Sequence, residues 1–298
     1  MASPTDALRE RFGAALKENE PLAKHLNFRI GGPARWFVEA KTEADVMDAV
    51  RLAGEHDVRL FVLGGGSNVL ASDAGFDGLV VKIALRAFAI DGTTVRAEAG
   101  VLSVALARAT AAAGLEGLEW MISLPGTIGG AVYGNAGCFG GETKDRLVSV
   151  RVLRGGRVED IPVAPADFGY RTSPFKNTDD VILAAVFQLQ TGDAAALKEK
   201  MDAQLAARKA SQPTNAGSAG CAFKNPPGHS AGALVDDAGL KGMRIGDAQI
   251  SPVHGNFILN LGQATADQVV QLIAVAKTRV RNQFGVQLEE EVRYIGFG

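Results

Sequence analysis

The chain has 298 residues, and its 31 Lys and Arg against 33 Asp and Glu give a formal net charge of −2. This length predicts about two domains and is enough to bury a core without disulfides or metal ions. The composition, 47% hydrophobic and 21% charged, excludes a disordered chain. The balanced charge excludes a general nucleic-acid-binding protein, because such proteins need a broad cationic face.

Neither a membrane span nor a secretion signal is expected. No apolar run approaches the roughly 18–20 residues of a transmembrane helix, and the N-terminal segment lacks the apolar core of a signal peptide. Cys138 and Cys221 are the only cysteines, neither lies in a CxxC pair, and the four histidines are scattered. We therefore expect no disulfide framework and no metal site. A chain with only two cysteines and no disulfide framework is also expected to be cytoplasmic.

Hydrophobic periodicity and capping residues predict helices and strands that alternate along the chain. The expected helices cover about 43–55, 101–113, 193–210 and 266–284. The expected strands cover about 59–63, 79–83, 95–99, 147–153, 158–163, 181–190, 256–261 and 286–295. Thr42 caps the first helix, Thr265 and Gln268 form a capping box for the last, and Gly285 ends it. The pattern predicts an α+β fold, with one unit of two lobes followed by a smaller αβ domain.

Glycine is in excess, at 36 residues, and is clustered. One cluster is GGGSN at 64–68, and the other is 125–141, which holds seven glycines and is expected to be neither helix nor strand. A single such loop is usually a tight turn. Two of them favour a dinucleotide or pyrophosphate ligand, because a glycine-rich backbone can approach a phosphate closely and point N–H groups at it. Neither loop carries the Rossmann fingerprint or a Walker lysine.

Seven segments, taken in order, extend this interpretation across nearly the whole chain. They are NFRIGGPA at 27–34, LGGGSNVL at 63–70, LPGTIGGA at 124–131 followed by NAG at 135–137, YRTSPF at 170–175, GCAFKNP at 220–226, SPVHGNF at 251–257 and LEEEVR at 288–293. Each segment alone is a weak signal. Together they resemble the UDP-N-acetylenolpyruvoylglucosamine reductase family, whose members complete UDP-N-acetylmuramate for peptidoglycan.

The resemblance implies a flavoenzyme of three parts. FAD would bind noncovalently between two lobes of the vanillyl-alcohol-oxidase type, at 1–83 and 84–197, and residues 198–298 would bind the nucleotide-sugar substrate. NADPH would be the hydride donor. Because the chain has no Rossmann fingerprint of its own for NADPH, we expect NADPH and the UDP-sugar to share one pocket in turn. We also expect a monomer, with neither nucleic acid nor membrane as a partner.

The matched motifs give candidate binding residues. The expected FAD ligands are Arg29, Gly31, Gly32, Pro33, Leu63, Gly64, Gly65, Gly66, Ser67, Asn68, Leu70, Pro125, Gly126, Thr127, Gly129, Gly130, Ala131, Asn135, Ala136 and Gly137. The expected substrate ligands are Tyr170, Lys224, Asn225, His254 and Asn256. A structural histidine is an equally ordinary interpretation of His254.

Three residues are the catalytic candidates. Arg171 could bridge the substrate carboxylate, since a guanidinium makes two parallel bonds and keeps its proton. Cys221 stands where most of the family has a serine proton donor, and a thiol can hold and deliver a proton at neutral pH. Glu291 would be a second acid or electrophilic group. Each candidate also has an ordinary structural interpretation. Arg171 could be a surface arginine, and Cys221 could be a small buried residue, as is expected of Cys138. Glu291 could belong to a solvated edge strand. Only 50 positions separate Arg171 from Cys221, which resembles the type of reductase that lacks an inserted tyrosine loop.

Two other functions stay open from the residues alone. The first is an FAD-dependent oxidase of alcohols or sugar lactones, in which His25 or His56 would tether the flavin. The second is a nucleotide-sugar-binding module without catalysis.

Overall fold

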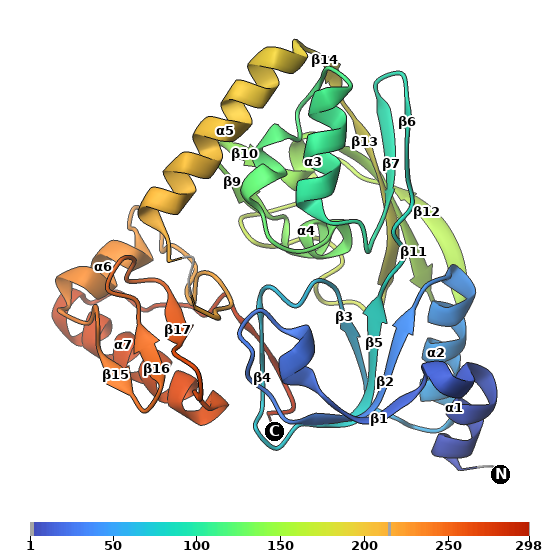
Figure 1. The fold of residues 1–298 in the computed structure, drawn as a ribbon, viewed down its shortest axis with the longest axis horizontal. Coiled ribbons are helices and arrows are strands. Elements are labelled where there is room, and N and C mark those ends of the chain that lie inside the picture. Colours follow the sequence, from blue (N-terminus) through green and yellow to red (C-terminus); the bar gives the residue numbers. More distant parts are fainter. Residues whose placement is uncertain (1–2, 214–215, 298) are drawn as a thin grey trace. The chain divides into compact units, whose positions relative to one another are not determined.

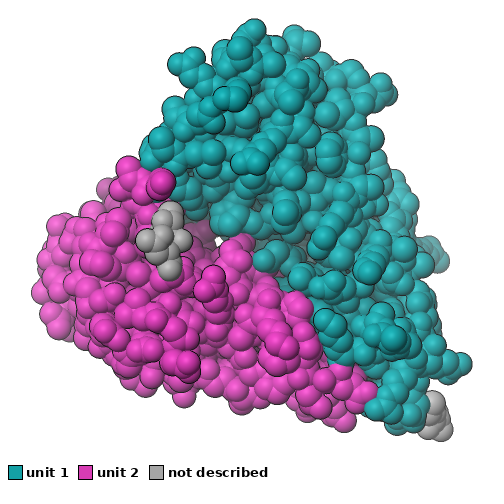
Figure 2. Space-filling model, viewed as in Figure 1, with its two compact units in different colours: residues 1–17, 37–65, 79–208 teal, residues 18–36, 66–78, 209–298 magenta. Residues whose placement is uncertain are grey.

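The computed structural model describes residues 3–213 and 216–297. They form two compact units, each built from separate stretches of sequence (Figure 2). Unit 1 takes residues 1–17, 37–65 and 79–208, and unit 2 takes residues 18–36, 66–78 and 209–298. The division into lobes at residues 83 and 197 stays a prediction.

Unit 1 is built around a five-stranded antiparallel sheet in the order β12-β11-β13-β7-β6 (Figure 1). Its strands are β6 (Phe88–Asp91), β7 (Thr94–Glu98), β11 (Leu147–Arg154), β12 (Arg157–Pro162) and β13 (Val181–Gln188). The central strand β13 has the sequence VILAAVFQ and is buried along nearly its whole length, as an apolar run in the middle of a sheet should be. Helices α3 (Ser103–Ala112) and α4 (Ile128–Gly134) belong to the same unit, and α4 packs against β13 and β7.

A second sheet has the order β1-β2-β5-β3 and positions the first glycine loop. Its strands are β1 (Lys17–Pro21), β2 (Pro33–Ala40), β3 (Leu60–Leu63) and β5 (Phe76–Ile83). Strands β3 and β5 are parallel, with Leu60 opposite Leu79, and α2 (Glu43–Glu55) connects β2 to β3. The GGGSN loop therefore begins at the carboxyl end of a parallel strand, the usual location of ligand-binding loops in such sheets.

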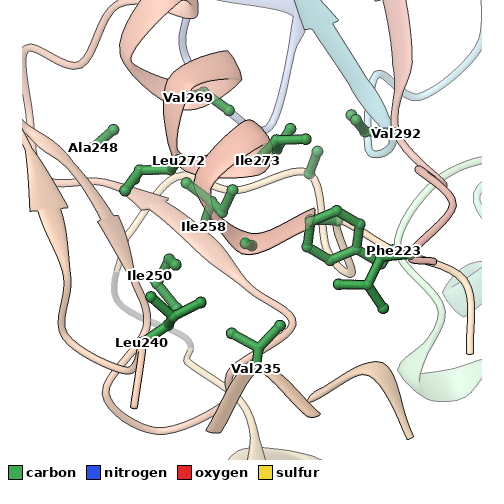
Figure 3. Packing of buried hydrophobic residues seen from close by; sticks show 14 of the residues in the cluster. Phe223, Val235, Leu240, Ala248, Ile250, Ile258, Val269, Leu272, Ile273 and Val292 are labelled. Carbon is green, nitrogen blue, oxygen red and sulfur yellow. The ribbon is translucent and has the colours of Figure 1, made fainter. Parts of the chain in front are cut away.

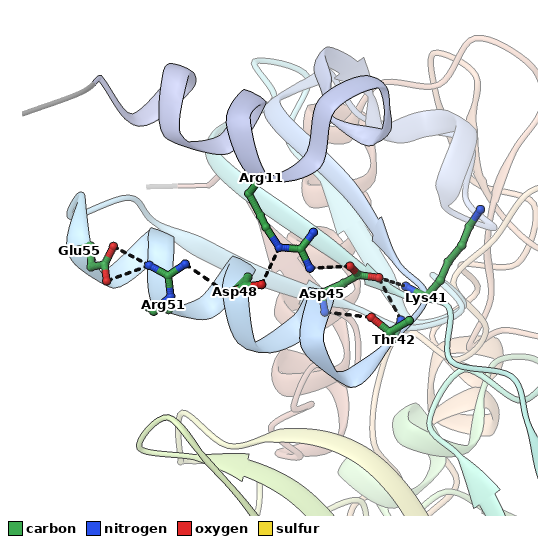
Figure 4. Close-up of polar contacts among 7 residues, drawn as sticks. All are labelled: Arg11, Lys41, Thr42, Asp45, Asp48, Arg51 and Glu55. Carbon is green, nitrogen blue, oxygen red and sulfur yellow. Dashed lines mark hydrogen bonds and ion pairs between the residues drawn. The ribbon is translucent and has the colours of Figure 1, made fainter.

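Ion pairs connect helix α1 (Pro4–Phe12) to helix α2 (Figure 4). The Arg11 guanidinium donates to Asp48 Oδ2 at 2.5 Å and to Asp45 Oδ1 at 2.9 Å. Asp45 also accepts from the backbone N–H of Thr42, whose hydroxyl accepts from the Asp45 N–H. The predicted cap of α2 is confirmed as a full capping box.

Unit 2 packs two helices against short strands. They are α6 (Ala231–Asp237), α7 (Ala266–Phe284), the antiparallel strands β15 (Arg244–Ile245), β16 (Ala248–Ile250) and β17 (Ile258–Asn260), and the parallel pair β4 (Val69–Ala71) and β18 (Arg293–Ile295). One face of α7 presents Val269, Leu272 and Ile273 to a core that also holds Phe223 (Figure 3). Its predicted capping box and its left-handed Gly285 terminus are both confirmed.

The remaining elements are one long helix and several short pieces. They are α5 (Ala194–Ser211), the strand pairs β8 (Leu115–Glu116) with β14 (Gln190–Thr191) and β9 (Gly137–Cys138) with β10 (Gly141–Glu142), and the 3₁₀ helices Gly13–Ala15, Leu22–His25, Glu119–Ser123, Thr143–Asp145 and Pro165–Asp167. Within the described ranges, no helix is long and apolar enough to cross a membrane.

Two predictions about secondary structure are wrong. Residues 125–141 were expected to be neither helix nor strand, yet they contain α4 and the β9–β10 hairpin. The helix forms in a glycine-rich sequence because close packing needs small residues: a Cβ on Gly129 would lie 2.8 Å from the Ala99 Cβ. Residues 286–295 were expected to be one strand, but only Arg293–Ile295 is. The stretch before it follows an irregular path fixed by contacts distant in sequence.

Candidate active site

The two glycine loops of the sequence meet within unit 1. A Cβ on Gly65 would lie 2.8 Å from the Gly126 Cα, and one on Gly64 would lie 2.9 Å from Thr127 Oγ1. A side chain on Gly65 would clash with backbone, because real Cβ atoms essentially never approach other atoms this closely, and a side chain on Gly64 would force the Thr127 hydroxyl to shift. The segment after β3 and the segment before α4 therefore form one glycine-lined cradle.

Thr127 supplies a polar atom to this cradle. Its hydroxyl is buried and has no hydrogen-bond partner among the described residues. The backbone N–H groups that follow are occupied, since Ile128 donates to the Val101 carbonyl at 2.9 Å and Gly129 to the Ala99 carbonyl at 2.8 Å. Buried hydroxyls are nearly always hydrogen-bonded, so this one is available to a bound water, ion or ligand atom. The cradle thus fits the dinucleotide that the glycine loops predicted.

The other predicted cofactor residues divide between the units. Unit 1 holds Leu63, Gly64, Gly65, Pro125, Gly126, Thr127, Gly129, Gly130, Ala131, Asn135, Ala136 and Gly137, and unit 2 holds Arg29, Gly31, Gly32, Pro33, Gly66, Ser67, Asn68 and Leu70. In unit 2, Gly32 and Gly66 face other backbone. A Cβ on Gly32 would lie 2.2 Å from the Asp73 carbonyl oxygen, and one on Gly66 would lie 2.2 Å from that of His25. There, glycine is required by close chain packing.

Arg171 lies in unit 1, in a tight turn between Gly169 and Thr172. Its backbone is left-handed, with φ of 56°, which costs free energy in any residue but glycine and recurs at functional sites. Its Nη2 donates to the Gly137 carbonyl at 3.2 Å, and its guanidinium lies 5.0 Å from the centre of the Tyr170 ring. The head group is thus oriented by two neighbours before any substrate binds.

Asn135 holds that turn. It is fully buried, and its Nδ2 donates to the Gly169 carbonyl at 2.9 Å and to Glu142 Oε2 at 3.0 Å. It also ends α4 in a left-handed conformation, which asparagine tolerates better than most residues. The second glycine segment therefore supports the Arg171 turn, a connection that no local sequence pattern indicates.

Cys221 and Glu291 lie on neighbouring segments of unit 2. Phe223 pairs with Glu290, the Glu291 N–H donates to the Ala222 carbonyl at 2.8 Å, and the Lys224 N–H donates to the Glu289 carbonyl at 2.8 Å. Both catalytic candidates are half-buried. The backbone segments that carry these two residues, 70 positions apart in the sequence, therefore lie next to each other.

Two asparagines fix these segments. Asn256 is 3% exposed, and its side chain both accepts from the Phe223 N–H and donates to the Phe223 carbonyl, each at 2.8 Å. The Asn68 side chain, from the first glycine loop, donates from Nδ2 to the Glu291 carbonyl at 3.0 Å, and the Asn68 backbone carbonyl accepts from the Arg293 N–H at 3.0 Å. The two amides replace the hydrogen bonds that a regular strand would supply.

The remaining substrate candidates also lie in unit 2. Lys224 forms an ion pair with Glu289, and Asn225 Oδ1 accepts from the Ala231 N–H at the start of α6 at 2.9 Å. His254 lies edge-on to Phe257, with ring centres 5.0 Å apart. Burial, reinforced by the Lys241 charge, lowers the pKa of His254. The imidazole is therefore neutral at physiological pH and suits hydrogen bonding better than charge pairing.

Cys138 differs from Cys221 in its surroundings. Its Sγ lies 3.4 Å from Ser123 Oγ and 3.5 Å from the Trp120 carbonyl oxygen. Burial raises the pKa of its thiol, and this outweighs the Ser123 hydrogen bond and the charges of Arg208 and Arg171. Cys138 therefore stays protonated and unreactive.

Family models match two parts of the chain. Residues 34–160 match an FAD-binding domain, and residues 212–295 match the C-terminal domain of UDP-N-acetylenolpyruvoylglucosamine reductase. The cradle and the Cys221–Glu291 segments thus belong to an FAD-dependent oxidoreductase with a separate C-terminal domain, which confirms the predicted fold class.

Full-length relatives specify the family. The reductases of Rubrobacter xylanophilus and Chloroflexus aggregans are 42% and 41% identical, matching 98% and 97% of this chain and 99% and 100% of their own. The crystal structure of the Thermus caldophilus reductase matches with a TM-score of 0.81 at 36% identity, over 94% of this chain and 99% of that one. The chain belongs to the UDP-N-acetylenolpyruvoylglucosamine reductase family, so the predicted resemblance is confirmed.

Proposed function

We propose that this protein catalyses the NADPH-dependent, FAD-mediated reduction of UDP-N-acetylglucosamine enolpyruvate to UDP-N-acetylmuramate, a peptidoglycan precursor. The observation that carries the proposal is the pairing of segment 221–224 with segment 289–291, which brings a thiol and a carboxyl group to neighbouring backbone. Two cysteines outside any disulfide bond fit a reducing cytoplasm.

The cradle of unit 1 would hold the cofactor. Gly64, Gly65, Gly126 and Thr127 would lie against it, with the Thr127 hydroxyl as a hydrogen-bonding partner. Bound FAD would supply the hydride for the β-carbon of the enolpyruvyl group after receiving one from NADPH. The chain itself has to orient the substrate, balance the charge that develops on it and deliver a proton.

Arg171 would bind the substrate carboxylate. As the β-carbon is reduced, negative charge develops on the α-carbon and its carboxylate, and a bidentate guanidinium meets it directly. A preorganised donor of this kind contributes about 3–4 kcal/mol to the transition state. Its contacts with Gly137 and Tyr170 supply the preorganisation.

Cys221 would hold a proton at Sγ and deliver it to the α-carbon, while Glu291 acts as the second acid or electrophilic group. A free thiol has a pKa of about 8.5 and is protonated at pH 7. Lys224 and Asn225 would bind the diphosphate, with Tyr170 and His254 beside the sugar nucleotide. Asn256 would act by positioning, because both polar atoms of its side chain already bond Phe223.

NADPH and the UDP-sugar would occupy one pocket in turn, in a monomeric enzyme. This order predicts ping-pong kinetics with inhibition at high substrate concentration. A ternary complex of enzyme, NADPH and UDP-sugar, detected kinetically or by crystallography, would contradict it.

The visible spectrum of the purified protein tests the function. The protein should be yellow, NADPH should bleach it under anaerobic conditions, and the enolpyruvyl substrate should restore the colour with formation of UDP-N-acetylmuramate. A colourless protein would indicate a binding module, and flavin that stays attached after acid precipitation would indicate a tethered oxidase. For such a tether His25 is poorly disposed, because its Nε2 lies 3.0 Å from Glu20 Oε1.

A further inference from the structure

A cluster of three polar side chains lies behind the Glu291 segment. Lys277, on α7, donates from Nζ to Glu290 Oε1 at 2.7 Å, and the Tyr294 hydroxyl donates to Glu290 Oε2. The Glu290 side chain is 25% exposed and that of Lys277 is 33% exposed. None of the three residues has a role in the chemistry described so far.

The cluster is ionic, and each carboxylate oxygen of Glu290 accepts one hydrogen bond. Burial opposes ionisation of Glu290, but the hydrogen bonds from Lys277 and Tyr294 outweigh it and hold the pKa of Glu290 below its usual value. Burial and the Glu290 carboxylate raise the pKa of Tyr294, so its phenol keeps the donated proton. A half-buried carboxylate with two such partners is a firm attachment point for the backbone that carries it.

The backbone of residues 286–292 does not form a strand, so no continuous ladder of hydrogen bonds to a neighbouring strand fixes it. Glu290 pairs with Phe223, and its neighbour Glu291 donates its N–H to Ala222. A shift of Glu290 would therefore move Glu291 relative to Cys221.

The geometry points to Lys277 and Tyr294 as positioning residues that hold Glu291 through the Glu290 carboxylate. This inference rests on the proposed function, because it takes Glu291 as a group that touches substrate. Misplacement of a reacting group by about 1 Å can slow a reaction by roughly a hundredfold. Loss of the hydrogen bonds to Glu290 should therefore slow the reaction measurably.

An open groove makes the cluster accessible. The groove has a volume of about 480 Å³ and is lined in part by Lys277, Glu290, Tyr294, Ile273 and Phe297. Removal of the Lys277 side chain would leave the Glu290 carboxylate facing this groove. A small primary ammonium ion could then take the place of the lost Nζ.

The test separates the two half-reactions in the holoenzyme. In Lys277→Met, flavin reduction by NADPH should stay within about twofold of wild type, while reoxidation by the enolpyruvyl substrate should slow by roughly tenfold or more. Lys277→Arg should retain most of the rate. Arg279→Met is the matched control, since Arg279 is an exposed cation on the same helix that does not line the groove. Tyr294→Phe, which removes one hydrogen bond and keeps the ring, should give a smaller loss in the same half-reaction.

Chemical rescue completes the test. Ethylammonium should restore part of the reoxidation rate of Lys277→Ala, and tetramethylammonium, which cannot donate a hydrogen bond, should not. Equal losses in both half-reactions, or a Lys277→Met that matches Arg279→Met, would overturn the inference. A wild type that the substrate does not reoxidise, or a Glu291→Gln as fast as wild type, would instead overturn the proposed function or the role of Glu291 in it.

Discussion

The two units hold their candidate site residues by different means. In unit 1 the cradle lies at the ends of regular elements, after β3 and before α4, and is shaped by glycines whose backbones touch. In unit 2, Cys221 and Glu291 stand on irregular segments tied by amide side chains and by the Glu290 cluster. The first arrangement depends on the absence of side chains and the second on their hydrogen bonds. Substitutions in unit 1 should therefore act by crowding the backbone, and substitutions in unit 2 by removing hydrogen bonds.

The largest expected effect is on the chemistry in unit 2. Cys221→Ala should still permit flavin reduction by NADPH but slow the oxidation by the enolpyruvyl substrate about 10²–10⁴-fold, the usual contribution of a positioned acid. Cys221→Ser should stay active, because a serine hydroxyl can also hold a proton at this position and donate it. Stopped-flow absorbance of each half-reaction measures both. If Cys221→Ala slowed the two half-reactions equally, Cys221 would be structural.

The next effect tests how the unit 2 segments are held. Asn256→Ala leaves the Phe223 N–H and carbonyl without their partner, and each buried unsatisfied group costs about 1–3 kcal/mol. We expect the free energy of unfolding to fall by about 2–4 kcal/mol in urea titrations. Asn282→Ala, at an exposed position on α7, should change it by less than about 0.5 kcal/mol. Equal values for the two variants would show that the Asn256 amide does not support this segment.

The regular elements of both units could be predicted from local patterns. Helices 43–55 and 266–284 carry an apolar stripe and a capping box, and both are found where expected. The glycine-rich helix α4 could not be predicted, because its sequence has low helix propensity and its formation depends on packing against Ala99. In 286–292 the charged alternation is typical of an edge strand, but what fixes this segment is a set of partners far away in the sequence.

The same limit applies to the site. Motifs identified residue types that can do chemistry, because thiol, guanidinium and carboxyl groups are recognisable one at a time. The motifs did not identify the residues that hold these groups in place. Asn68 was expected to contact the cofactor, yet its amide donates to Glu291, 223 positions away. A single sequence carries no signal for a hydrogen bond between such distant residues.

A smaller effect is expected for the cradle of unit 1. Gly65→Ala places a methyl group 2.8 Å from the Gly126 Cα, so the backbone of one loop has to shift. Overpacking of this kind costs about 1–3 kcal/mol, and we expect the dissociation constant for FAD, measured by flavin fluorescence, to rise about tenfold or more. Gly54→Ala is the control, because no atom lies within 4 Å of a Cβ there. It should leave FAD binding unchanged and, within α2, raise the stability by at most about 1 kcal/mol. Unchanged FAD affinity in Gly65→Ala would show that the loops do not form the flavin site.

The smallest effect concerns the attachment of α1 to α2, which involves neither candidate site. The Arg11 hydrogen bond lowers the pKa of Asp48. Burial alone would raise the pKa of Asp45. The hydrogen bonds that Asp45 accepts from Thr42, Arg11 and the backbone outweigh burial, so the pKa of Asp45 is also lowered. A carboxyl group whose pKa is lower in the folded state stabilises the protein above its ordinary pKa of 3.8, and this stabilisation is lost as the pH falls through the folded-state value.

Arg11→Met should therefore lower the free energy of unfolding by up to about 1 kcal/mol at pH 7, since the ions are partly exposed. The difference from wild type should shrink below about pH 4. Arg86→Met, an exposed arginine of the same unit without an ion pair among the described residues, should show no such pH dependence in thermal unfolding. A pH-independent loss in Arg11→Met would mean that Arg11 stabilises α1 through its contact with the Phe12 ring, 4.9 Å away, rather than through the two carboxylates.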